Sequence, residues 1–265
     1  MKRQIPIELV WQVSALIISI ILVHLVYQTV IRPNADADLA AQAEQQASME
    51  QAPRSIYVVL KDYEQESCFV LMLWALAMMG FKTRSVLREQ TLLHEEFINI
   101  RDGVNILPED VRNYTRPLQA LPQQQRDLLL PRTLLAALNR FASTENVQDS
   151  SQAVKGTCES ESDRLDSELS MIRYIAWAIP SIGFIGTVRG ISEALGQAYQ
   201  AVEGNIAGVT ASLGVAFNST FIALIISIVL MFFMHQLQLM QERLVLDTEH
   251  YCDQRLLRHL RSSVA

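Results

Sequence analysis

The sequence is poor in the features on which most enzymes and nucleic-acid-binding proteins depend. Its 22 Lys and Arg residues are outnumbered by 28 Asp and Glu residues. The resulting net charge of −6 argues against a nucleic-acid surface, because neutralising phosphates requires clustered positive charge. The sequence also lacks a G-x-S-x-G element, a phosphate-binding loop and paired carboxylates in an apolar setting. We therefore expect a chain that is not an enzyme and binds no nucleic acid.

Cysteine and internal repeats are scarce as well. The three cysteines, Cys68, Cys158 and Cys252, lie far apart, which favours free thiols in a reducing compartment over a disulfide framework. No Cys and His spacing is typical of zinc, so we predict neither a metal site nor a cofactor. The missing repeat argues against a transporter built from inverted halves. A transporter or a scaffold that conducts no ions nevertheless stays an alternative.

Hydrophobic residues make up half of the chain and charged residues 19%, so the two kinds must be segregated if part of the chain lies in a membrane. A helix needs about 20 apolar residues to cross a bilayer. Residues 7–31, 171–196 and 209–237 contain runs of that order, and residues 67–82 contain a shorter one. We interpret residues 7–31 as a retained anchor, because the apolar part is longer than that of a signal peptide and no cleavage site follows it.

Basic residues decide whether the shorter run crosses the membrane. Lys2 and Arg3 precede the first span, and arginines recur in the C-terminal tail. Lys82 and Arg88 follow the short run. Because basic flanks stay in the cytoplasm, an even number of crossings must come before Lys82. The sequence therefore predicts four spans in a bacterial inner membrane with both termini cytoplasmic; an interfacial helix at residues 67–82 is the alternative.

The expected fold is all-α, a multi-pass membrane protein with a helical cytoplasmic domain into which the third and fourth spans extend. Its predicted segments are a cytoplasmic N-terminus (1–6), the first span (7–31), a periplasmic loop (32–66), the second span (67–82), the cytoplasmic domain (83–170), the third span (171–196), a periplasmic turn (197–208), the fourth span (209–237) and a cytoplasmic C-terminal helix (238–265).

Periodicity and breakers subdivide the cytoplasmic parts. Apolar spacing predicts a helix over Arg84–Ile100, and a proline suited to a first turn predicts another over Pro131–Phe141. The polar stretch Ala142–Thr157 is typical of a mobile linker. From Glu159 the helical pattern runs without a breaker into the third span, and Gln238–Ser263 is expected to continue the fourth.

Small and weakly polar residues recur at helical spacing in the last two spans. They are Gly183, Thr187, Gly190 and Ala194 in the third span, and Ser212, Ala216, Ser219, Thr220, Ala223 and Ser227 in the fourth. Close helix packing is one explanation of such stripes. A pore is the other, because hydroxyl groups in hydrocarbon are most stable when they face water or a polar partner.

Two segments of these spans resemble the MotA/TolQ/ExbB family. The stretch Pro180–Gly190 resembles the proline–glycine–Gly-Thr-Val-x-Gly signature of TolQ and ExbB, and Ala216–Leu224 is similar to the Ala-Phe-x-x-Thr segment of MotA-type subunits. The resemblance covers Ile172–Gln238, and the four-span layout is closest to MotA. It implies a channel-forming subunit of a rotary stator-type motor that uses the ion-motive force, with H⁺ or Na⁺ as the transported ion. A flagellar-type or phage-defence stator is a more specific alternative.

The resemblance also implies partners and site residues. It implies a homopentamer whose third and fourth helices surround a pore, with two copies of a single-span subunit similar to MotB, ExbD or TolR inside it. Thr187 and Thr220 match the family's pore-facing threonines. The other residues expected along the ion path are Ser219, Ser227, Gly183, Gly190, Ala216 and Ala223.

The chain departs from the family pattern at two positions. Val215 stands where ExbB and TolQ carry a glutamate, and Arg189 stands where an apolar residue is common. Arg189 points away from Thr187, and we expect it to pair with Glu193 four residues on; a role in gating is the alternative. Pro180 is expected to kink the third span.

Acidic residues are missing from the middle of the predicted spans. An ion path needs a titratable or anionic carrier, so the resemblance implies that the partner supplies one as a membrane aspartate. His24 has no acidic neighbour in the sequence, and we therefore expect it to form a contact between helices rather than a proton relay.

Overall fold

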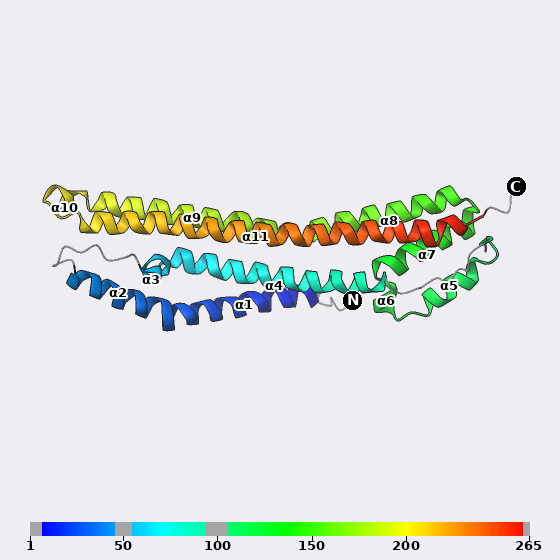
Figure 1. Ribbon diagram of the computed structural model, residues 1–265, viewed down its shortest axis with the longest axis horizontal. Coiled ribbons are helices and arrows are strands. Elements are labelled where there is room, and N and C mark those ends of the chain that lie inside the picture. The colour runs from blue at the N-terminus through cyan, green and yellow to red at the C-terminus, as the bar shows by residue number, and fades with distance from the viewer. Residues whose placement is uncertain (1–6, 46–54, 94–104, 262–265) are drawn as a thin grey trace, which may run out of the picture. The chain divides into compact units, whose positions relative to one another are not determined.

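A computed structural model describes residues 7–45, 55–93 and 105–261 of the chain (Figure 1). Within these ranges the chain is helical apart from turns and one isolated bridge between Ile106 and Leu260, which confirms the all-α prediction. The chain forms two compact units. The first contains Met1–Gly80 and Met171–Met234, and the second contains Phe81–Ser170 and His235–Ala265.

The first unit is built from long apolar helices. Its elements are α1 (Ile7–Val26), the π-helical turn η1 (Tyr27–Ile31), α2 (Arg32–Gln45), α3 (Ile56–Leu60), the first part of α4 (Tyr63–Leu92), α9 (Ser170–Gly196), α10 (Ala198–Val202) and the first part of α11 (Ala207–Arg255). Among the described residues, four helical stretches are long and apolar enough to cross a membrane. The second is α4, whose 30 residues extend well beyond the short apolar run seen in the sequence.

The second unit packs short helices against the ends of longer ones. It contains α5 (Val111–Gln119), α6 (Gln123–Arg126), α7 (Leu129–Thr144), α8 (Val147–Glu168), η3 (Leu257–His259) and the remaining parts of α4 and α11. Its core includes Leu134 and Phe141 of α7, Val154 of α8 and Leu256 after α11, all nearly inaccessible to solvent.

Several predictions for this region are confirmed. Pro131 lies in the first turn of α7. One residue, Leu169, separates α8 from α9. The helix α11 continues the fourth apolar segment as predicted, but it ends at Arg255 and not at Ser263. The helix predicted over Arg84–Ile100 is present through Leu92, and its later part lies outside the described residues.

The predicted linker Ala142–Thr157 is wrong, because α7 ends at Thr144 and α8 begins at Val147. Glu145 adopts a left-handed conformation (φ 54°) that closes α7, and the Asn146 side chain accepts a hydrogen bond from the Gln148 N–H as the cap of α8. The polar composition concealed a helix whose buried face is Ser150, Val154 and Cys158.

Candidate functional site

Helices α9 and α11 meet along their small residues. A Cβ atom on Gly183 would lie 2.5 Å from Cβ of Ala223, and one on Gly190 would lie 2.7 Å from both the backbone N of Ala216 and the backbone O of Ser212. Such distances leave no room for a side chain. The small-residue stripes therefore allow the two backbones of this chain to approach closely.

Hydroxyl groups join these two helices through backbone carbonyls. Ser227 donates a hydrogen bond to the carbonyl of Ala176 at 3.0 Å, and Thr220 donates to that of Gly183 at 2.9 Å. In the opposite direction, Thr187 of α9 donates to the carbonyl of Ala216 at 3.0 Å. A hydroxyl in an apolar contact is costly without a partner, so these bonds stabilise the helix pair.

Thr187 and Thr220 lie side by side at the edge of this contact. Their hydroxyl groups are hydrogen-bonded to each other, and both side chains are partly exposed. Of the eight residues expected along the ion path, Ser227 is also partly exposed. The other five are buried between the helices, namely Ser219, Gly183, Gly190, Ala216 and Ala223. Packing thus accounts for the buried members, while the threonine pair presents oxygen atoms at a surface.

Arg189 has a partner that the sequence did not indicate. Its Nε and Nη2 atoms donate to the two carboxylate oxygens of Glu64 at 2.7 and 2.9 Å. It also contacts Glu193 at 3.2 Å, the contact that the spacing suggested. Glu64 lies in the first turn of α4. Its Cγ is 3.2 Å from the position that a Cβ on Gly186 would take. Gly186 therefore leaves space for the carboxylate that holds Arg189.

A second carboxylate near the start of α4, that of Glu66, binds His24 of α1 and Arg32 of α2. Glu66 accepts a bond from Nη2 of Arg32 at 2.5 Å, and its other oxygen lies 2.7 Å from Nδ1 of His24. The guanidinium of Arg32 also lies 4.5 Å from the ring centre of Tyr63. His24 thus has an acidic neighbour after all, 42 residues away, and forms the helix contact that we expected.

We predict that removing Arg189 destabilises the chain through the carboxylate left behind. Glu64 is only 12% exposed, and an isolated buried charge costs more than the pair contributes. Arg189→Leu should lower the midpoint of thermal unfolding in detergent by several degrees, whereas Arg189→Leu combined with Glu64→Gln should recover most of the loss. Glu193→Gln, which removes the weaker and more exposed partner, is the matched control. Equal losses in the single and double variants would contradict this account.

The family model of the MotA/TolQ/ExbB proton channel family matches residues 125–250. Over these residues the chain is similar to the MotA/TolQ/ExbB proton channel family. The matched segment contains α7 to α10 and most of α11, and so the threonine pair and its hydrogen bonds. No curated protein and no solved structure matches the chain.

The match to the MotA/TolQ/ExbB family supports a proton channel subunit and, with the four long apolar helices, a multi-pass membrane protein. The family is one of channels rather than enzymes, and its subunits work with a partner. Within the described residues, no group of His, Cys, Asp or Glu could hold a metal ion. Glu64 lies outside the matched segment, whereas Arg189, which it binds, lies inside it.

Proposed function

We propose that this MotA/TolQ/ExbB-type subunit forms the channel of a rotary stator-type complex in the bacterial inner membrane. Five copies surround a pore, both termini are cytoplasmic, and the ion-motive force drives mechanical work through a single-span partner. The observation that carries this proposal is the pairing of Thr187 and Thr220 at the exposed edge of the α9–α11 contact.

The threonine pair suits transient contact with a cation. The two hydroxyls share two hydrogens among the carbonyls of Ala216 and Gly183 and their contact with each other, so at most one of their lone pairs is used within the pair and the others remain available as acceptors. Oxygen ligands fixed in this way can replace part of the hydration shell of H⁺ or Na⁺ as it passes. Neither hydroxyl is titratable at physiological pH, so the charge must be taken up elsewhere. A membrane aspartate of the partner fills that role.

Exposed apolar side chains beside the pair support assembly around it. Phe184 of α9 is 64% exposed, and Phe217 and Phe221 of α11 are 66% and 60% exposed. Phe184 and Phe217 lie three residues before Thr187 and Thr220, so each is next to a threonine on its own helix, and Phe221 directly follows Thr220 in sequence. A hydroxyl pair flanked by aromatic rings is suited to contact with further membrane helices, whether from other copies or from the partner.

Thr220→Val is expected to reduce ion flux by about tenfold, the equivalent of losing one hydrogen bond of about 1.4 kcal/mol to the passing ion. Valine keeps the shape of threonine but removes the oxygen. Thr220→Ser retains the oxygen and should keep most of the flux. The measurement is uptake of H⁺ or Na⁺ by vesicles that contain the chain and its co-expressed partner, compared at equal amounts of assembled complex. Unchanged flux through the valine variant would refute the assigned role.

A further inference from the structure

Helix α9 contains a proline in its interior. The helix runs unbroken from Ser170 to Gly196, and Pro180 lies within it. Because proline has no backbone N–H, it cannot donate the usual hydrogen bond to the carbonyl four residues earlier, which is that of Ala176. Ala176 is only 3% exposed, and an unpaired carbonyl in a membrane helix is costly. The gap in the hydrogen bonding of α9 therefore requires a donor from elsewhere.

The side chain of Ser227 on α11 supplies this donor. Its Oγ donates a hydrogen bond to the carbonyl oxygen of Ala176 at 3.0 Å. A serine within a helix can instead bond to the carbonyl four residues earlier in its own helix. The serines that do so here are Ser14, Ser19, Ser67 and Ser181. The Ser227 hydroxyl reaches across to the facing helix, to the carbonyl that Pro180 leaves without its amide partner.

The threonine hydroxyls bond to carbonyls of a different kind. Thr187 donates to the carbonyl of Ala216, and Thr220 donates to that of Gly183. The residue four positions after each of these carbonyls is a threonine, which has a backbone N–H to donate within its own helix. Those carbonyls therefore keep a helical hydrogen bond without the side chain, whereas the carbonyl of Ala176 does not.

We propose that Ser227 is a positioning residue whose hydroxyl takes the place of the missing amide of Pro180 and so holds α9 against α11 beside the threonine pair. The sequence placed Ser227 along the expected ion path. In the structure its hydrogen is committed to the backbone of α9. The predicted effect on ion flux rests on the proposed channel function, whereas the replacement of an amide by a hydroxyl does not.

The Ser227 bond lies close enough to the threonine pair to affect its geometry. Ser227 follows Thr220 by seven residues on α11, and Pro180 precedes Thr187 by seven residues on α9, so each is about two helical turns from its threonine. A proline is also the usual place for a helix to bend. Without the bond, α9 can bend or turn at Pro180, and Thr187 is no longer held in one position relative to Thr220.

A double-mutant cycle on unfolding tests whether the hydroxyl replaces the amide. Ser227→Ala should lower the midpoint of thermal unfolding of the full chain in detergent by several degrees. In a Pro180→Ala background, where residue 180 has its own N–H, the same change should cost little. Ser181→Ala is the matched control, because the Trp177 carbonyl that loses the hydroxyl keeps the backbone N–H of residue 181. Equal losses from Ser227→Ala in both backgrounds overturn the proposal.

A second pair of variants decides the question if the Pro180→Ala chain does not fold. Ser227→Thr keeps the hydroxyl, and Ser227→Val has the same shape without it. The threonine variant should unfold near the wild-type temperature and the valine variant several degrees lower. Equal stability of these two variants would show that the oxygen at position 227 does not support α9.

Ion flux distinguishes positioning from direct contact with the ion. Uptake of H⁺ or Na⁺ is measured in vesicles that contain the chain and its co-expressed partner, at equal amounts of assembled complex. Ser227→Ala should lower the flux by about tenfold in the native background, and should not lower it in the Pro180→Ala background, although the oxygen is absent from both.

The other outcomes of the flux measurement each have one meaning. A loss of flux from Ser227→Ala in both backgrounds would make the hydroxyl a ligand of the ion, and an unchanged flux in the native background would remove it from conduction. Either result overturns the positioning role. A wild type that conducts no ions defeats the proposed channel function instead, and the unfolding cycle still decides whether Ser227 compensates for Pro180.

Discussion

Gly190→Val is expected to separate α9 from α11 and to abolish the folded first unit. The new Cβ would lie 2.7 Å from backbone atoms of Ala216 and Ser212, and backbone atoms cannot rotate away as the end of a side chain can. Overpacking of a well-packed contact costs about 1–3 kcal/mol. We expect more than that here, because moving the helices apart also breaks the bond from Thr187 to the Ala216 carbonyl.

Gly214→Val is the matched control for this prediction. It makes the same substitution on the facing helix, at a position where, apart from the adjoining backbone of α11 itself, no heavy atom of the described residues lies within 4 Å of the added Cβ. Thermal unfolding of the purified chain in detergent, followed by circular dichroism, compares the two variants. Two valine variants of similar stability would show that α9 and α11 do not depend on close backbone approach.

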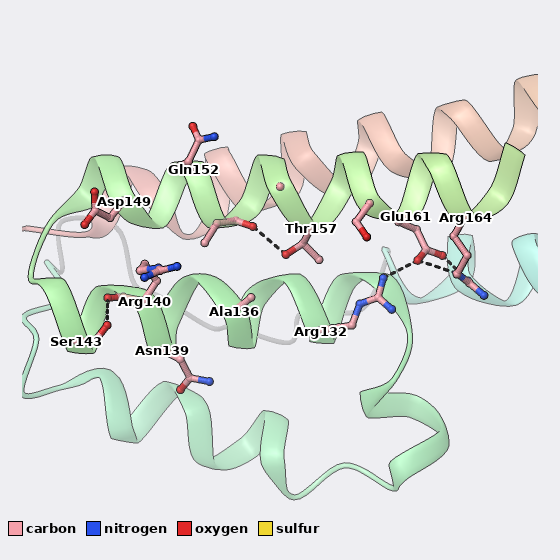
Figure 2. A pocket seen from close by; sticks show the side chains of 13 residues that line it. Arg132, Ala136, Asn139, Arg140, Ser143, Asp149, Gln152, Thr157, Glu161 and Arg164 are labelled. Carbon is pink, nitrogen blue, oxygen red and sulfur yellow. Dashed lines mark hydrogen bonds and ion pairs between the residues drawn. The ribbon is translucent and has the colours of Figure 1, made fainter. Parts of the chain in front are cut away.

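Removing Arg132 and Arg164 together is expected to destabilise the second unit by about 3–5 kcal/mol, because the buried Glu161 carboxylate would lose both cations (Figure 2). The two arginines would be replaced by methionine, which preserves much of their apolar volume. Adding Glu161→Met should restore most of the stability, since an apolar residue needs no partner. Arg140→Met, which removes an arginine without an ion pair, is the control and should have little effect on unfolding.

The pH dependence of these variants provides an independent measurement. Burial alone would raise the pKa of Glu161, but the hydrogen bonds and charges of Arg164 and Arg132 outweigh burial and hold the pKa below its usual range. The carboxylate therefore contributes stability above its unfolded pKa, and that stability is lost as the pH falls through the lower pKa of the folded state. Without the arginines, burial dominates and the sign reverses, so the double variant should become more stable on acidification. If the free energy of unfolding changed with pH in the same way in the wild type and in the double variant, Arg132 and Arg164 would not be what lowers the pKa of Glu161.

The main helices and the threonine pair could be predicted from the sequence because local patterns encode them. Apolar runs of sufficient length identify membrane helices, and small residues at helical spacing mark the faces that hold Thr187 and Thr220, while the resemblance to MotA/TolQ/ExbB singled out these two threonines. The apolar runs and the spacing of small residues each involve residues close together in one helix, so both can be recognised in a single sequence.

The ion pairs of α4 could not be predicted, because choosing between distant partners depends on how helices pack. Glu64 and Arg189 are separated by 125 residues. The sequence placed Glu64 and Glu66 in an outer loop, whereas the structure sets them against α9 and α1. The linker prediction for the polar stretch before Thr157 was wrong for a different reason. Its glutamines lie on the solvent face of α8, and the one local signal of a helix start was Asn146.

Apart from the contact between Thr187 and Thr220, the hydrogen bonds described between α9 and α11 end on main-chain oxygens, and this shapes how the chain can change in evolution. Every residue type has a carbonyl, so no mutation at Ala176, Gly183 or Ala216 removes an acceptor. Those positions are constrained by size alone, whereas the donor positions are constrained by chemistry. Drift on the accepting side should therefore be limited by volume, so that Gly183 stays glycine, while the donating side should exchange only serine with threonine. The sequences of related subunits can be read for that asymmetry.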